Sequence, residues 1–133
     1  MKPKATHLLI LAFGLTACQE NFDQRLQREA KEFTETHCPQ EPEPGTRLDS
    51  TTYSPATRTY TLWYTLSAEN EQTTRENASL LHRLLVRELT ADVNYKSVKD
   101  QRVTFRYVYH SLQSGGVVYE TLVTAEEYSY VIP

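Results

Sequence analysis

The sequence predicts an α+β fold of two layers, in which an antiparallel four-stranded sheet carries two helices on one face. Two observations predict this fold. Apolar residues recur at helical spacing in two segments, and they alternate with polar residues in two pairs of strand-like segments. Along the chain the order is helix, hairpin, helix, hairpin, so two similar units can join into one sheet and bury their apolar sides against each other.

The chain has room for one domain. It has 133 residues, of which 39% are hydrophobic and 23% are charged. This composition excludes a disordered chain, a collagen-like repeat and a protein with several membrane spans. We assign residues 21–133 to a single domain, residues 1–17 to an export signal and residues 18–20 to a short tether.

The export signal has a basic start, Lys2 and Lys4, followed by an apolar run from Leu8 to Leu15. This run is far shorter than the roughly 20 residues that cross a bilayer. It ends in Leu15-Thr16-Ala17-Cys18, which resembles the lipobox of bacterial lipoproteins. Cleavage before Cys18 would leave 12 Lys and Arg against 17 Asp and Glu, a net charge of −5 in place of −3. Such an acidic envelope protein is not expected to bind nucleic acid.

The lipobox resemblance implies that Cys18 receives a diacylglycerol on its thiol and that its new amino group is acylated. Two or three acyl chains anchor a protein stably to a membrane. The alternative is an ordinary signal peptide, whose removal leaves Cys18 or its neighbour as a free N-terminus. Gln19 stands where retained inner-membrane lipoproteins of enteric bacteria carry Asp, so the resemblance favours the outer membrane. Because only Gln19 and Glu20 precede the first helix, we expect the domain to lie within about 7 Å of the lipid surface.

The first helix is expected from Asn21 to about His37, with Asn21 as its cap and Gln24 completing a capping box. Prolines at 39, 42 and 44 then end it. Its apolar residues fall at helical spacing and are Phe22, Leu26, Ala30 and Phe33.

Two strands are expected next, from about Arg47 to Ser54 and from Thr57 to Leu66. The second alternates cleanly, with Tyr60, Leu62, Tyr64 and Leu66 on one face and Thr59, Thr61, Trp63 and Thr65 on the other.

The polar segment from Ser67 to Thr73 is predicted to be a loop. After it, Thr73 and Glu76 form a capping-box pattern, which predicts a second helix from about Thr74 to Asp92. Its leucine stripe makes this helix the main apolar contributor to the core.

A last hairpin is expected from about Arg102 to Leu112 and from Val117 to Thr124. Thr124 and Glu127 repeat the capping-box pattern, which indicates a short helical turn, and the tail after Tyr128 is apolar enough to pack. This order of elements resembles that of small envelope inhibitor and PepSY-type modules, with a cystatin-like wrap as the other candidate.

The candidate chemical groups favour no reaction and no cofactor. His37, His82 and His110 lack the spacing of metal ligands. Ser79 lies three residues before His82, but no acid is expected beside that imidazole, so neither a catalytic nor a metal site is predicted. With Cys18 lipidated, Cys38 is the one remaining thiol, expected to be either a small buried hydrophobe or half of a disulfide between chains.

Aromatic residues are the feature that indicates binding. The chain has 9 Tyr and 1 Trp, mostly on the expected strands. Helices can cover only one face of the sheet, so Trp63 and Tyr119 could form a platform on the open face, although strands favour aromatic residues in any case. We predict a non-enzymatic, lipid-anchored envelope protein that binds another envelope protein. The alternative is a platform for a glycan or a small apolar ligand.

Overall fold

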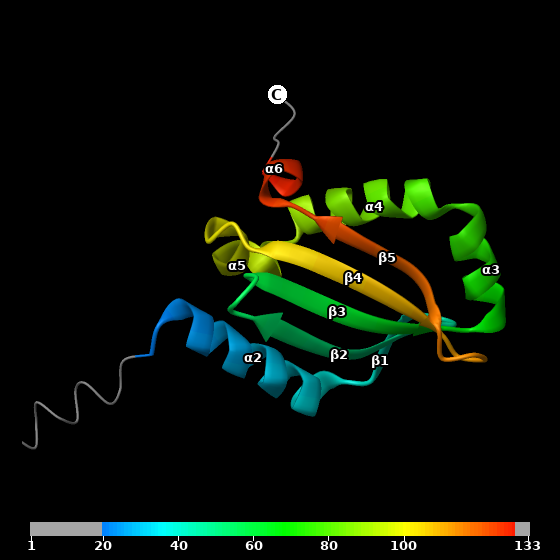
Figure 1. Ribbon diagram of the computed structural model, residues 1–133, viewed down its shortest axis with the longest axis horizontal. Coiled ribbons are helices and arrows are strands. Elements are labelled where there is room, and N and C mark those ends of the chain that lie inside the picture. The colour runs from blue at the N-terminus through cyan, green and yellow to red at the C-terminus, as the bar shows by residue number, and fades with distance from the viewer. Residues whose placement is uncertain (1–19, 130–133) are drawn as a thin grey trace, which may run out of the picture.

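The computed structural model describes residues 20–129, which form one five-stranded sheet with helices packed against it (Figure 1). The strands lie side by side in chain order and are β1 (Gln40–Glu43), β2 (Thr46–Ser54), β3 (Thr59–Leu66), β4 (Thr104–Ser111) and β5 (Val117–Val123). The helices are α2 (Phe22–His37), α3 (Ala68–Glu76), α4 (Ala78–Ala91), the 3₁₀ turn η1 (Val93–Tyr95), α5 (Lys96–Asp100) and α6 (Ala125–Tyr128).

The export signal, Cys18 and the C-terminal residues 130–133 lie outside the described residues. Within residues 20–129, none of the helices is long and apolar enough to cross a membrane.

The sheet is mixed, so the prediction of a wholly antiparallel sheet is wrong. β3 and β4 pair in parallel, with Tyr60 beside Phe105 and Leu66 beside Ser111. The chain between them forms α3, α4, η1 and α5 and returns to the end of the sheet where β3 begins. β4 must therefore run in the same direction as β3.

The sheet also has a fifth strand where the prolines predicted only the end of a helix. β1 pairs with β2 in antiparallel fashion, with Gln40 beside Leu48 and Glu43 beside Thr46. Proline cannot donate a hydrogen bond to a neighbouring strand, but it is tolerated at the edge of a sheet, where Pro42 lies.

The first helix matches its prediction. The N–H of Gln24 donates to the Asn21 side chain at 2.8 Å, and the N–H of Asn21 donates to the Gln24 side chain at 3.2 Å. The capping box read from the sequence is therefore confirmed, and it sets where α2 begins.

The polar segment after β3 is a helix, so the predicted loop is wrong. The hydroxyl of Ser67 caps α3 by accepting from the N–H of Asn70 at 3.3 Å. None of the residues of α3 is buried, so this helix lacks the apolar periodicity that would reveal it.

The predicted capping box at Thr73 and Glu76 is also wrong. Thr73 lies inside α3, and its hydroxyl donates to the carbonyl of Glu69 at 3.2 Å. The leucine-rich helix begins only at Ala78, after a break at Asn77.

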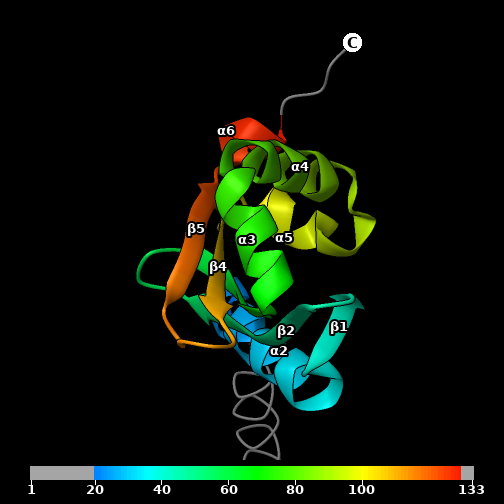
Figure 2. The same cartoon turned by 90° about the vertical axis from the view of Figure 1, so that its right-hand side faces the viewer.

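Both long helices lie on one face of the sheet, as predicted. On this face the Thr51 hydroxyl donates to the Ala30 carbonyl of α2 at 2.9 Å, while Leu85 and Leu89 of α4 are buried. Figure 2 shows α3, α4 and α5 on one side of the strands, whose other side carries no helix in the described part of the chain. The alternation of β3 was predicted correctly, and it turns Tyr60, Leu62, Tyr64 and Leu66 toward the helices.

Candidate functional site

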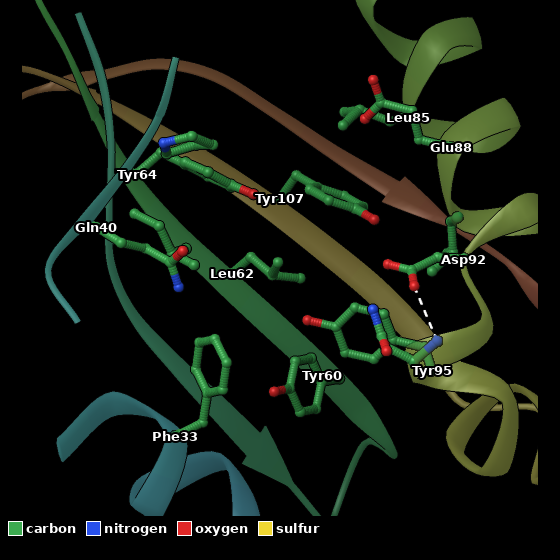
Figure 3. Close-up of a pocket in the computed structure, with 14 residues that line it drawn as sticks. Phe33, Gln40, Tyr60, Leu62, Tyr64, Leu85, Glu88, Asp92, Tyr95 and Tyr107 are labelled. Carbon is green, nitrogen blue, oxygen red and sulfur yellow. Dashed lines mark hydrogen bonds between the residues drawn. The ribbon is translucent and has the colours of Figure 1, made fainter. Parts of the chain in front are cut away.

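A groove opens on the helix-bearing face of the sheet (Figure 3). Residues of α4 and η1 form one wall, residues of α2 and β1 form the other, and β3 and β4 form much of the floor. Its volume is about 430 Å³. The groove exists because α2 packs over β2 and α4 packs beside β5, which leaves part of the central strands uncovered.

Aromatic rings make up much of the floor. Tyr64 stacks on Tyr109 with ring centroids 4.7 Å apart and planes at 11°, and Tyr60 meets Tyr95 edge to face at 5.7 Å. Strand alternation places Tyr60, Tyr64 and Tyr109 on one face together with Leu62, and Tyr95 reaches that face from η1. Because each ring is held by a neighbour, the floor is a rigid apolar surface.

The tyrosine hydroxyls of the groove are donors at neutral pH. Burial raises the pKa of Tyr64 to about 12, and it also raises the pKa values of Tyr60, Tyr95 and Tyr107. The nearby Glu88 carboxylate adds to the rise for Tyr64 and Tyr107. Groups that shuttle protons in catalysis need pKa values near the working pH, so these hydroxyls suit binding rather than acid–base chemistry.

The rim of the groove is acidic. Glu88 lies on α4, and Asp92 follows it and caps η1 by accepting from the N–H of Asn94 at 2.9 Å, the dashed line of Figure 3. A second hollow of about 330 Å³ shares Tyr64 and Glu88 with the groove and adds Glu43. In the described part of the chain, no Lys, Arg or His lines either hollow.

The structure does not bring Trp63 and Tyr119 together, so the predicted binding face is wrong in this respect. Trp63 lies beside Val108, which lies beside Glu120, so these three share the helix-free face. Tyr119 lies beside Tyr109 on the helix-bearing face, with ring centroids 6.3 Å apart. Side chains alternate along a strand, and the register of β4 with β5 places Glu120, and not Tyr119, on the same face as Trp63.

The Trp63 ring is already engaged by its neighbours. Its N–H donates to the Thr52 hydroxyl at 2.8 Å, the Arg106 guanidinium lies 5.3 Å from its centroid, and the His110 ring stacks on it at 6.1 Å. Val108 is only 1% exposed although no helix of residues 20–129 covers this face. Trp63 therefore helps to shield a small second core.

His82 has an acidic partner that the sequence analysis did not find. Its Nδ1 lies 2.6 Å from the Thr121 hydroxyl, and its Nε2 lies 2.7 Å from a Glu127 carboxylate oxygen. The other oxygen of Glu127 accepts from the N–H of Thr124 at 3.1 Å, which confirms the capping box predicted for α6. These contacts join α4, β5 and α6 outside the groove, and Ser79 takes no part in them.

The remaining candidate residues have packing roles. Cys38 carries a free thiol that is half-buried against the core, and burial raises the pKa of that thiol. The His37 ring lies 4.9 Å from the Phe33 ring. Among residues 20–129, no group of three His, Cys, Asp or Glu side chains is placed to hold a metal ion.

Residues 21–119 match a family described as a domain of unknown function, DUF8479. The chain belongs to this family. The match begins at the cap of α2 and ends within β5, so the groove lies inside the DUF8479 domain, whereas Glu127 lies beyond it. No curated protein matches the chain.

Solved structures share the fold of this DUF8479 chain. A protein of Pseudomonas aeruginosa described as secreted has a TM-score of 0.68 at 10% identity, over 83% of this chain and 99% of that one. The pilotin EpsS of the Vibrio vulnificus type 2 secretion system has a TM-score of 0.60 at 14% identity, over 80% and 94%. The pilotin AspS of the Vibrio cholerae type II secretion system has a TM-score of 0.51 at 18% identity, over 79% and 94%. At these identities the likeness shows a shared fold.

Sequence analysis found the rings of the DUF8479 groove but not the groove itself. It placed Tyr60 and Tyr64 on one face of a strand, and by giving Trp63 to the open face it assigned theirs to the helices. It gave no role to Glu88 and Asp92, whose spacing of four residues places both on one side of the helix predicted to end at about Asp92, beside its leucine stripe. That spacing was the one available signal.

Proposed function

We propose that this protein is a non-enzymatic lipoprotein of the cell envelope that binds a segment of another envelope protein in its groove. The groove carries the proposal, because it offers a rigid aromatic floor and protonated hydroxyls on the face that the helices leave partly open. The fold shared with two secretion-system pilotins supports a place in the envelope and a role in protein interaction.

The shape of the groove favours a chain segment over a small molecule. Pockets for small ligands enclose most of the ligand surface. Here the groove continues past Tyr64 and Leu85 into the second hollow, so it suits a segment that buries one side of its length. The alternative is a site for a glycan or a small apolar ligand on the face around Trp63. There the Trp63 ring already contacts Arg106 and His110.

The lipid anchor is the second part of the proposal. Cys18 would carry the acyl chains, and Gln19 favours the outer membrane. Cys18→Ser should release the protein from membranes, because the anchor would have no attachment point. The measurement is the distribution of the protein between the membrane and soluble fractions, and an unchanged membrane share would contradict the anchor.

Photo-crosslinking in cells tests the groove. A photoreactive amino acid at Gln40, on the rim, should crosslink to another envelope protein, whereas the same group at Leu122 on the helix-free face should not. Both positions are exposed, so they form a matched pair. Crosslinking from Leu122 and none from Gln40 would place the interaction on the opposite face and overturn the proposal.

A further inference from the structure

We infer that the groove binds a chain segment in which apolar side chains are accompanied by lysine or arginine. This inference rests on the proposed function and names the chemistry of the partner segment. Three properties of the described residues carry it: the apolar floor, the free tyrosine hydroxyls and the unopposed charge of the rim.

The floor selects apolar side chains. Leu62 is 6% exposed and lies between Tyr60 and Tyr64, Leu48 is equally buried beside Tyr64, and Leu85 and Leu89 close the α4 side of the groove. Apolar side chains placed there would lose their contact with water, which is the main favourable contribution to most protein association. A wholly polar segment would gain nothing from this surface.

The hydroxyls fit the backbone of a chain segment. Two buried tyrosines outside the groove have partners within the protein: Tyr53 donates to Asp23 at 2.6 Å, and Tyr128 donates to the Val103 carbonyl at 2.8 Å. Of the groove tyrosines, Tyr60 lies within hydrogen-bonding reach of Thr51 and Tyr95, whereas the hydroxyls of Tyr64 and Tyr107 have no hydrogen-bond partner among the described residues. Protonated hydroxyls that lack a partner can donate to the carbonyl groups of a bound chain.

The charge of the rim selects cations. Glu43, Glu88 and Asp92 line the groove and its continuation, and none of them is in a salt bridge within residues 20–129. All four acids of α2 are instead paired with Arg or Lys, as Glu29 and Glu32 are. Carboxylates of one sign in a concave surface concentrate the field, which attracts cationic side chains and repels anionic groups such as lipid phosphates.

The test is selection from a library of random 12-residue peptides displayed on phage, against the acylated protein in nanodiscs. Selected peptides should combine apolar residues with Lys or Arg. Glu88→Lys should weaken their binding by about tenfold, which corresponds to the loss of one charge contact of about 1.4 kcal/mol. Glu76→Lys, the same change at an exposed residue of α3 outside the groove, should change it by less than about twofold.

A neutral variant separates this inference from the proposed function. Leu84→Gln alters the wall of the second hollow at a residue that is 38% exposed, without changing charge. Peptides that are weakened by Leu84→Gln but lack Lys and Arg, and that tolerate Glu88→Lys, would overturn the cationic partner and leave groove binding intact. If the binding of no selected peptide depends on Leu84, both the proposed binding in the groove and the cationic partner segment are wrong. Both are also wrong if the groove holds a second copy of this chain, in a dimer that Glu88→Lys separates.

Discussion

At the scale of single residues, side chains of the strands themselves cover the centre of the helix-free face. Trp63 of β3 has its N–H bonded to Thr52 of β2 and its ring beside Arg106 and His110 of β4. Arg106 is also paired with Glu120 of β5. This arrangement gives an exposed sheet face a buried centre at Val108.

Trp63→Ala should therefore lower stability rather than groove binding. Fully buried tryptophans cost about 3–5 kcal/mol when cut to alanine. Trp63 is half-buried, so we expect about 2 kcal/mol, measured as a lower urea midpoint. Trp63→Phe should lose less, because it retains a ring over Val108. If Trp63→Ala unfolds at the wild-type midpoint, the packing role given to this ring is wrong.

Gly45→Ala should destabilise the link between β1 and β2. Gly45 has φ of +85°, and a Cβ there would lie 2.6 Å from the Ser67 hydroxyl that caps α3. The left-handed conformation alone costs an alanine about 1–2 kcal/mol. Gly116→Ala is the control, since a Cβ there meets nothing closer than 3.5 Å. Equal urea midpoints for the two variants would contradict this account.

At the scale of elements, one carboxylate, that of Glu127, links α6 to α4. Partial burial would raise the pKa of Glu127, but the N–H of Thr124 and the His82 imidazole outweigh it and hold that pKa below its usual value. The ionised carboxylate therefore stabilises the fold above the ordinary carboxyl pKa of about 4.3. This stabilisation is lost as the pH falls through the lowered folded-state value.

Glu127→Gln should remove part of the acid sensitivity of the protein. We expect the variant to have a lower Tm than the wild type at pH 6 and a smaller fall in Tm between pH 6 and pH 3, measured by circular dichroism. His82→Gln keeps the bond from Thr124, so it should retain part of the acid dependence. A wild-type pH profile in Glu127→Gln would show that this carboxylate is not linked to folding.

Elements were predictable from sequence where local chemistry decides them. The Asn21 and Thr124 caps and the alternation of β3 follow from neighbouring residues, and they were predicted correctly. α3 and β1 have no apolar face of their own, so periodicity could not reveal them. The parallel pairing of β3 with β4 depends on the path of the helices between them, which no local pattern encodes.

The groove was harder to predict than its residues. Its tyrosines on β3 and β4 lie at alternate strand positions that the sequence shows, yet the gap above them depends on how far α2 and α4 lie apart over the sheet. That distance is a property of packing between segments remote in sequence. For the same reason the register that separates Tyr119 from Trp63 could not be read from either strand alone.

At the scale of the whole molecule, a short tether would fix which end faces the bilayer. The first turn of α2 and the turn between β2 and β3 lie at one end, where Arg58 is paired with Asp23 at 3.3 Å (Figure 1). The turn between β4 and β5 lies at the other end. Since Glu20 already contacts Arg28 of α2, little free chain remains between Cys18 and the domain.

A fluorophore at Ala56, in the turn between β2 and β3, should therefore be quenched by headgroup-labelled lipid more strongly than one at Gln113, in the turn between β4 and β5. The labels are attached to introduced cysteines in a Cys38→Ser background, with the protein acylated at Cys18 in vesicles. The eight residues of β3 span about 26 Å at ~3.3 Å per residue, which is enough for quenching to distinguish an upright molecule. A flexible spacer of ten Gly and Ser residues inserted after Gln19 should make the two positions more alike, because it frees the domain to tumble. Equal quenching without the spacer would show that the domain is not held upright by its N-terminal end.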